Sequence, residues 1–157
     1  MNGANAIAAE AMRNHAALLR ELYADARLSR AELARRVGLS APAVGERLRR
    51  LEEAGVIRAY RAEIEPAALG YALTVLIRAR PSPGRMRGMI EEIRGTEQIV
   101  RCERVSGDDC FVAWAHVRDV TEMEAVIDRL VPFGATHSSI VQSAPVEPRL
   151  VRLPDGT

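Results

Sequence analysis

Residues 28–60 read LSRAELARRVGLSAPAVGERLRRLEEAGVIRAY, and their pattern determines the fold expected of the N-terminal part of the chain. Leu33 and Val37 fall four residues apart, which predicts a short helix with one apolar face. Gly38 suits the left-handed position that ends a helix. Ser40 then stands where an N-cap begins a second helix. The stretch therefore predicts two helices joined by a tight turn.

The second helix pattern separates apolar side chains from charged ones. Val44, Leu48 and Leu51 recur at i, i+4 and i+7, and Pro42 lies in the first turn, where a missing N–H costs nothing. The outer face carries Glu46, Arg49, Arg50 and Glu53. Such a pair is the helix-turn-helix arrangement, whose second helix enters the DNA major groove. Two ordinary core helices with a solvated charged face remain the alternative, because the glutamates lie close to the arginines.

A further helix is predicted before this pair. Over residues 14–24, Leu18, Leu19 and Leu22 fall on one face and would brace the other two helices. We expect residues 1–12 to form a frayed arm or the lead-in to this helix. Ser29 and Glu32 have the spacing of a capping box at the start of the next helix.

The segment after the second helix of the pair alternates only in part. Gly55 suits the residue that ends that helix, and Val56–Ile64 is typical of a short strand or wing. Three helices with a wing form a winged helix-turn-helix domain, predicted over residues 1–65. Residues 66–72 are small and mixed, and we interpret them as a linker.

Four strands and two helices are predicted next, in the order strand, helix, strand, strand, helix, strand. Their bounds are 73–80, 85–94, 98–105, 110–117, 121–130 and 137–143. Thr121 and Glu124 have the spacing of a capping box for the second of these helices. A tail with an edge strand at Leu150–Leu153 would end the domain, residues 73–157. This order is the ferredoxin-like βαββαβ pattern, so the fold class is α+β.

Such a sheet, covered by two helices, leaves its other face bare. The first strand, LTVLIRAR at residues 73–80, is apolar on both faces. A bare apolar sheet of this size is an interaction surface, and a second copy of the chain is the simplest cover for it. We therefore expect a homodimer.

Composition bounds the class of protein. Hydrophobic residues make up 48% of the 157 and charged residues 27%, with a formal net charge of +1. No apolar run approaches the ~20 residues of a membrane helix, and no secretory signal is evident, so we expect a cytoplasmic protein without a membrane partner. Cys102 and Cys110 are too few for a disulfide framework. The chain has no lysine, so its basic side chains, histidine apart, are guanidinium groups.

Four stretches carry a resemblance to a known family: LLREL at 18–22, the stretch at 28–60, ERVSGDDCFVAW at 103–114 and THSSIVQSAPV at 136–146. Together they resemble the Lrp/AsnC, or feast/famine, transcription regulators over nearly the whole chain. The resemblance implies that the winged domain binds palindromic operator DNA. It also implies that the second domain, called RAM (regulation of amino-acid metabolism), forms dimers and then tetramers or octamers that bind small effectors, usually amino acids.

The resemblance also assigns two sets of residues. The expected DNA contacts are Ser29, Arg30, Ser40, Ala41, Pro42, Ala43, Glu46, Arg47 and Arg50. Arg50 and Ser40 suit phosphates, whereas Glu46 and Arg47 suit base edges. The expected effector contacts are Gly107, Asp108, Asp109, Thr136, Ser138 and Ser139. An Asp-rich hairpin turn and ordinary serines and threonines on an edge strand are the alternative reading of the second set.

Three positions depart from the family pattern. Asn14-His15 stands where many members have an aspartate pair, and Gly45 lies inside the second helix, where it costs roughly 1 kcal/mol against alanine. Cys110 stands near the position where many members have a second effector-loop aspartate. The absence of that carboxylate weakens the case for a simple amino-acid effector.

No set of residues is typical of an enzyme, a metal site or a cofactor site, so we expect a non-enzyme without cofactor or metal. One competing class is the siroheme decarboxylases, which resemble this family in both domains and act through histidines and arginines; His116 and His137 keep that alternative open. A third alternative is an effector-binding assembly protein that no longer binds DNA.

Overall fold

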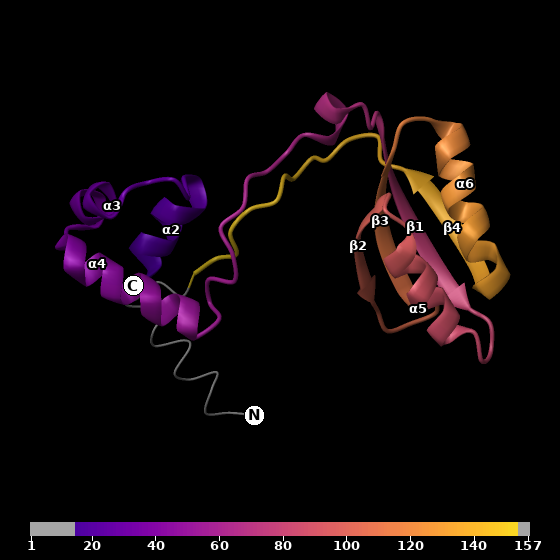
Figure 1. Ribbon diagram of the computed structural model, residues 1–157, viewed down its shortest axis with the longest axis horizontal. Coiled ribbons are helices and arrows are strands. Elements are labelled where there is room, and N and C mark those ends of the chain that lie inside the picture. The colour runs from indigo at the N-terminus through magenta and orange to yellow at the C-terminus, as the bar shows by residue number, and fades with distance from the viewer. Residues whose placement is uncertain (1–14, 154–157) are drawn as a thin grey trace. The chain divides into compact units, whose positions relative to one another are not determined.

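The computed structural model describes residues 15–153, which form two compact units (Figure 1). Residues 15–63 and 146–153 belong to the first unit, and residues 64–145 form the second. The expected N-terminal arm, residues 1–12, and Asn14 lie outside the described residues. No helix in the described part of the chain is long and apolar enough to cross a membrane.

The described residues of the first unit form three helices, α2 (Ala16–Ala24), α3 (Arg30–Val37) and α4 (Ala41–Glu53). They occupy the three positions predicted from apolar spacing. Their inward faces form one hydrophobic core, whose most deeply buried side chains are Leu18, Leu33, Val44 and Leu51. The apolar stripes thus fix how the three helices pack, and the charged faces are left outside.

Local capping sets the turn between α3 and α4. Ser29 Oγ accepts a hydrogen bond from the Glu32 N–H at 3.2 Å, and Ser40 Oγ accepts one from the Ala43 N–H at 3.3 Å. Gly38 adopts φ of 68°, which a side chain would oppose, and so ends α3. The predicted helix-turn-helix is confirmed, including both N-caps.

Two of the predicted strands are absent from the structure. The segment Val56–Ile64 forms no strand in the structure, because its alternation is incomplete and Tyr60 and Ile64 remain exposed. Residues 150–153 also form no strand. Leu153 is instead buried in the core of the helical unit, and Leu150 packs beside it. The tail, expected with the sheet domain, therefore belongs to the first unit, since its two leucines add to that core.

The second unit has the predicted βαββαβ order. It begins with a 3₁₀ turn, η1 (Pro66–Leu69), and its elements are β1 (Leu73–Pro81), α5 (Met86–Gly95), β2 (Ile99–Arg104), β3 (Phe111–Val117), α6 (Val120–Leu130), η2 (Val131–Phe133) and β4 (Gly134–Ile140). The antiparallel sheet has the strand order β2-β3-β1-β4. The ferredoxin-like α+β architecture is confirmed.

Alternation along the strands separates the two faces of the sheet. Val75, Ile77 and Ala79 of β1 are buried in the same cluster as Met89 of α5 and Val126 of α6. Both helices therefore cover one face. The side chains between these, such as Leu76 and Trp114, lie on the opposite face and are only half-buried.

The observed bounds differ from the predicted ones by one residue at every element except β4, where they differ by three, and two of the differences have an identifiable cause. Asp119, not Thr121, caps α6: its carboxylate accepts the Glu122 N–H at 2.8 Å. Aspartate is the stronger N-cap, so the helix begins earlier. The last strand spans Gly134–Ile140 instead of 137–143. Gly134 pairs with Pro81 and approaches it so closely that a Cβ would lie 2.7 Å from the Pro81 Cα, which fixes where pairing begins.

Candidate nucleic-acid interface

A shallow groove of about 440 Å³ runs between the start of α3 and the outer side of α4. It is lined by Arg30 together with Ala41, Pro42, Gly45, Glu46 and Arg49. The groove brings Arg30 of α3 together with three of the expected DNA contacts on α4, namely Ala41, Pro42 and Glu46. In a helix-turn-helix domain, the first turns of the second helix face the major groove of DNA. The Arg30 guanidinium lies beside these turns here.

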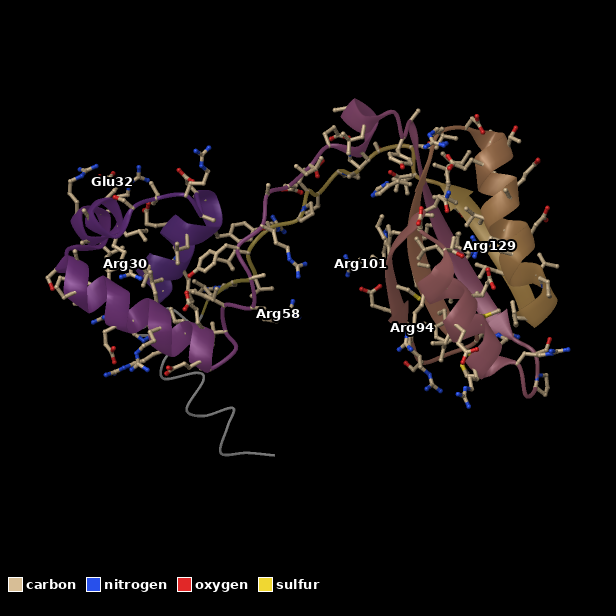
Figure 2. The ribbon with its side chains drawn as sticks, viewed as in Figure 1. Arg30, Glu32, Arg58, Arg94, Arg101 and Arg129 are labelled. Atoms are coloured by element: carbon tan, nitrogen blue, oxygen red, sulfur yellow. The ribbon has the colours of Figure 1, made fainter. Side chains whose placement is uncertain are left out.

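Gly45 gives the Arg30 side chain its place in this groove. A Cβ built on Gly45 would lie 3.6 Å from Arg30 Nη1 and 3.9 Å from its Cδ and Cζ. Figure 2 shows Arg30 reaching from α3 toward α4. The helix-weakening glycine therefore lies beneath an exposed arginine, where a side chain longer than alanine would displace it.

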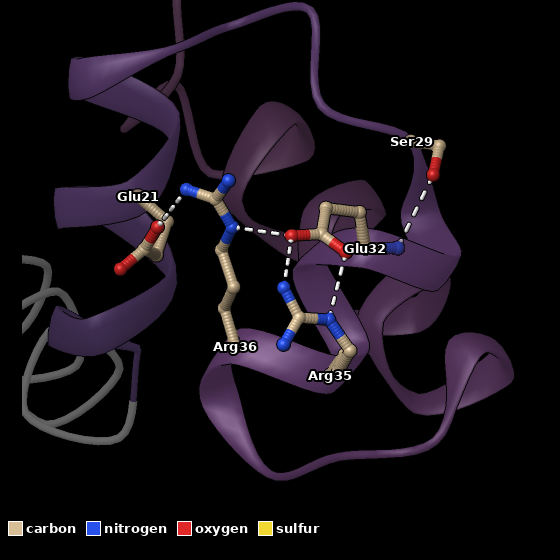
Figure 3. Close-up of polar contacts among 5 residues, drawn as sticks. All are labelled: Glu21, Ser29, Glu32, Arg35 and Arg36. Carbon is tan, nitrogen blue, oxygen red and sulfur yellow. Dashed lines mark hydrogen bonds and ion pairs between the residues drawn. The ribbon is translucent and has the colours of Figure 1, made fainter.

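A cluster of charged side chains joins α3 to α2 (Figure 3). Glu32 accepts hydrogen bonds from Arg35 Nε at 2.9 Å and Nη2 at 2.6 Å, and from Arg36 Nε at 2.7 Å. Arg36 Nη1 also donates to Glu21 of α2 at 3.0 Å. The hydrogen bonds from Arg35 and then Arg36 lower the pKa of Glu32 to about 2.

The same arrangement recurs on α4. Glu46 accepts from Arg49 Nε at 3.1 Å and Nη2 at 2.9 Å, and from Arg50 Nε at 2.8 Å. Arg49 Nη1 also donates to Glu53 at 2.5 Å. The bonds from Arg49 and then Arg50 lower the pKa of Glu46 to about 2. Two arginines on the outer face of α4 are thus already bound to carboxylates of their own helix.

The structure distributes the predicted DNA contacts unevenly. Ser29, Arg30, Ser40, Pro42, Glu46 and Arg50 are exposed, whereas Ala41, Ala43 and Arg47 are half-buried. Both serine hydroxyls already accept a backbone N–H as caps.

The prediction omitted Arg49 and Glu52, which line the groove with Arg30. The i, i+3 spacing of Glu46 and Arg49 was the available signal for the first. Glu52 accepts a hydrogen bond from Tyr60 Oη at 2.7 Å, and burial with this bond raises the pKa of Tyr60 to about 12. Nothing local in the sequence indicates that contact.

The turn expected to bind an effector is held by β1. Gly107 adopts φ of 106°, and the Cys110 N–H donates to the carbonyl of Ala79 at 3.1 Å. Arg80 Nη2 lies 3.7 Å from an Asp108 carboxylate oxygen. Arg78 Nη1 lies 3.9 Å from one of Asp109.

Of the three hydroxyl residues on β4, only Thr136 lies near this turn. Thr136 is opposite Ala79, the residue whose carbonyl binds the turn. Ser138 and Ser139 are opposite Ile77 and Leu76, farther along β1, and consecutive strand residues point to opposite faces. Within one copy of the chain, therefore, the six predicted effector contacts do not form one cluster.

A second cavity, of about 590 Å³, lies at the other end of the sheet. Leu69, Tyr71, Val100, His116 and Arg118 are among its lining residues. The Arg118 guanidinium stands over the Tyr71 ring, 5.4 Å from the centroid, and His116 Nδ1 lies 3.1 Å from Thr74 Oγ1. Nothing local in the sequence indicates this cavity, because η1 and β3 meet only in the fold.

Metal-binding geometry is absent from residues 15–153: no three His, Cys, Asp or Glu side chains there are placed to hold an ion. Cys102 and Cys110 are free thiols, and both pack against the sheet core. Burial raises the pKa of Cys102, with a smaller contribution from Glu103.

A capped helix-turn-helix with arginines on its second helix, followed by a βαββαβ domain, defines a two-domain DNA-binding regulator. Comparison with known families agrees with this class. Residues 13–58 match the model for winged helix-turn-helix DNA-binding domains, and residues 74–151 match the Lrp/AsnC ligand binding domain. The chain belongs to the Lrp/AsnC family of transcriptional regulators.

Individual relatives support the assignment. The chain is 35% identical to the HTH-type transcriptional regulator LrpA of Mycobacterium tuberculosis over 72% of this chain and 76% of that protein. A crystal structure of the leucine response regulatory protein LrpA from that organism superposes with a TM-score of 0.73 at 31% identity, covering 92% of this chain and 98% of that one. LrpC of Bacillus subtilis gives 0.79 at 27%, covering 83% and 93%. The relatives named in this comparison are regulators of transcription, which points away from an enzyme.

Proposed function

We propose that the protein binds palindromic operator DNA as a homodimer that assembles further to a tetramer or octamer. We propose also that a small metabolite, an amino acid or a related compound, binds the RAM domain where copies meet and changes operator occupancy. The observation that carries the proposal is the groove at the start of α4, which Arg30, Glu46 and Arg49 line together with Pro42 of the first turn.

The DNA contacts in this proposal are those expected from the resemblance, and Arg30, Ala41, Pro42 and Glu46 among them line the groove. Arg30 and Arg50 contact phosphates, and Glu46 and Arg47 face base edges. The remaining proposed contacts, at Ser29, Ser40, Ala41, Pro42 and Ala43, place the helix start against the backbone of the duplex. Two copies of α4 would read half-sites about one helical turn apart.

The bare face of the sheet supports the dimer. Leu76, Val112 and Trp114 are half-buried on that face, although no helix of the unit covers them. The Arg101 guanidinium stands 4.6 Å from the centroid of the Trp114 ring. An apolar strip of this kind, rimmed by charged residues, is typical of an interface between subunits.

The effector site is proposed at Gly107, Asp108 and Asp109, with Thr136, Ser138 and Ser139. The two aspartates lie near Arg80 and Arg78, so a ligand with both an ammonium and a carboxylate group would find groups of both signs. Since the residues of one copy do not converge, the proposal requires that neighbouring copies complete the site.

Selection of binding sites from a pool of randomised duplexes tests the proposal. The purified full chain should enrich a palindromic sequence and should elute in size-exclusion chromatography at the mass of a dimer or a multiple of it. Thermal-shift screening of amino acids would then identify the effector, because a ligand at 100 times its Kd adds about 2.7 kcal/mol of stability. Enrichment of no sequence by an oligomeric protein would instead favour an assembly protein without DNA binding.

A further inference from the structure

Both helices of the helix-turn-helix carry the same pattern of charged residues. The sequence ELARR at 32–36 and the sequence ERLRR at 46–50 each place one glutamate three and four residues before a pair of arginines. In each helix the glutamate accepts two hydrogen bonds from the first arginine and one from the second. We refer to each glutamate with its two arginines as a clamp.

The two clamps differ in what surrounds them. In the α3 clamp, Arg36 also binds Glu21, so the cluster ties α3 to α2. In the α4 clamp, the side chains of Glu46, Arg49 and Arg50 are 44%, 55% and 66% exposed, and they lie on the helix expected to contact DNA. One clamp therefore has a role between helices, whereas the other covers the outer face of α4.

We propose that Glu46 is a specificity-determining residue that competes with DNA phosphates for Arg49 and Arg50. The proposal rests on α4 being the helix that contacts DNA. Either arginine can bind a phosphate through its full donor set only if it gives up its bond to Glu46, since these bonds occupy the same guanidinium edges. The loss of these bonds reduces the binding free energy for a duplex of any sequence.

The exchange also leaves the Glu46 carboxylate without its partners beside the negative backbone of the duplex. A donor on the DNA can then replace the lost partners, and the N4 amino group of cytosine is such a donor in the major groove. A site that presents this donor regains the lost bonds, while other sequences do not. Glu46 therefore weakens binding to arbitrary sequence more than it weakens binding to the operator.

The test compares Glu46→Gln with wild type by fluorescence anisotropy. Each full-length protein is titrated against a duplex of scrambled sequence and against the duplex selected by wild type, at several KCl concentrations. For Glu46→Gln we expect affinity for the scrambled duplex to rise about 5- to 10-fold, and log K against log [KCl] to steepen by about 1 to 2, roughly 0.9 for each added phosphate contact. Affinity for the selected duplex should rise less or fall, so the specificity ratio decreases.

Two single variants control for the loss of a negative charge. Glu52→Gln removes the same charge from the same helix, and Glu52 accepts its hydrogen bond from Tyr60 Oη. Glu32→Gln opens the α3 clamp, which is not on α4. Glu32→Gln should change affinity for the scrambled duplex less than twofold. Glu52 also lines the groove, so Glu52→Gln measures what the loss of one charge there adds by itself, and that increase should be clearly smaller than the one for Glu46→Gln. Glu46→Ala repeats the test without an amide that can still accept from the arginines.

A variant lacking both arginines gives the decisive comparison. In the Arg49→Ala/Arg50→Ala background, adding Glu46→Gln should raise affinity for the scrambled duplex no more than Glu52→Gln does, because no arginine bond is left to release and only the loss of charge remains. If the full increase persists there, or if Glu52→Gln matches it, Glu46 acts only through its charge and the proposal is wrong. An unchanged affinity in Glu46→Gln also overturns it. If wild type binds neither duplex, the failure lies with DNA binding itself.

Discussion

The Arg30 side chain lies across Gly45, with its Nη1 3.6 Å from the position that a Cβ on the glycine would occupy. This distance is an ordinary van der Waals contact, so alanine fits beneath the arginine. We therefore expect Gly45→Ala to raise the free energy of unfolding by about 1 kcal/mol, since alanine is the better helix former. Urea denaturation measures this change. A loss of stability would show that the groove does not tolerate even a methyl group.

Replacement of Arg50 by alanine tests the contribution of the outer face of α4. We expect Arg50→Ala to weaken operator binding about tenfold and to flatten the salt dependence by about 0.9, the loss of one phosphate contact. The side chain is 66% exposed, so the unfolding midpoint should stay close to that of wild type. Equal affinity of the two proteins in gel-shift titrations would exclude Arg50 from the interface.

The tail offers a matched pair of substitutions. Leu153 is 6% exposed within the core of the helical unit, whereas Val151, two residues before it, is 76% exposed. Leu153→Ala should lower the free energy of unfolding of that unit by about 2 kcal/mol or more, because it leaves a cavity. Val151→Ala should change it by less than about 0.5 kcal/mol. Equal effects in chemical denaturation would mean that the tail does not pack as described.

Gly134 fixes the start of β4 against β1. A Cβ at this position would lie 2.7 Å from the Pro81 Cα and 2.8 Å from the Ser82 nitrogen, and backbone atoms cannot move aside as a side chain does. Gly134→Ala should therefore destabilise the sheet unit by roughly 1–3 kcal/mol, as overpacking does. Gly95→Ala is the control, because its nearest neighbour is the end of the Arg129 side chain at 3.9 Å. Thermal denaturation of the two variants should separate them clearly.

The two clamps predict how stability responds to acid. Arginine hydrogen bonds lower the pKa of Glu32 and Glu46 from 4.5 to about 2 in the folded protein. Stabilisation by these carboxylates is therefore complete above pH 4.5 and is lost as the pH falls toward 2. Helix content of wild type, followed by circular dichroism between pH 6 and 2, should fall at a lower pH than the value of 4.5 at which free glutamate side chains take up protons.

A double variant, Glu32→Gln with Glu46→Gln, provides the control for this titration. Its stability should depend less on pH over the same window, because neither position can gain a proton. Both clamps are exposed to solvent, so the difference is modest and is best measured at low ionic strength. Superimposable pH profiles of the two proteins would indicate that the clamps add nothing to stability.

Local signals predicted the helical unit well. Ser29, Gly38 and Ser40 act within their own turns, so neighbouring residues are sufficient to recognise them. The predicted start of α6 was wrong because local signals were ambiguous there. Asp119 and Thr121 are both possible caps two residues apart, and only the hydrogen bond from the Glu122 N–H to Asp119 distinguishes them. Alternation likewise predicted the strands, but the register of β4 depends on close backbone contact at Gly134.

Contacts between distant segments were beyond a reading of the sequence. The aspartates of the β2–β3 turn lie near Arg78 and Arg80 because of the register of β1 with β3, which periodicity alone does not fix. Arg30 reaches Gly45 only when two helices cross. The expected DNA contacts could therefore be listed from the sequence and its resemblance to a known family, but the contacts among these residues could not.

Leu153 also has a consequence for synthesis on the ribosome. Domains of a nascent chain commonly fold as they emerge, starting from the N-terminus. Here the core of the helical unit includes Leu153, which is translated after the whole sheet unit, residues 64–145. A chain released early, even one that contains every residue of α2, α3 and α4, lacks part of that core. The helix-turn-helix unit is thus completed late in translation, and a prematurely terminated chain carries a less stable copy of it.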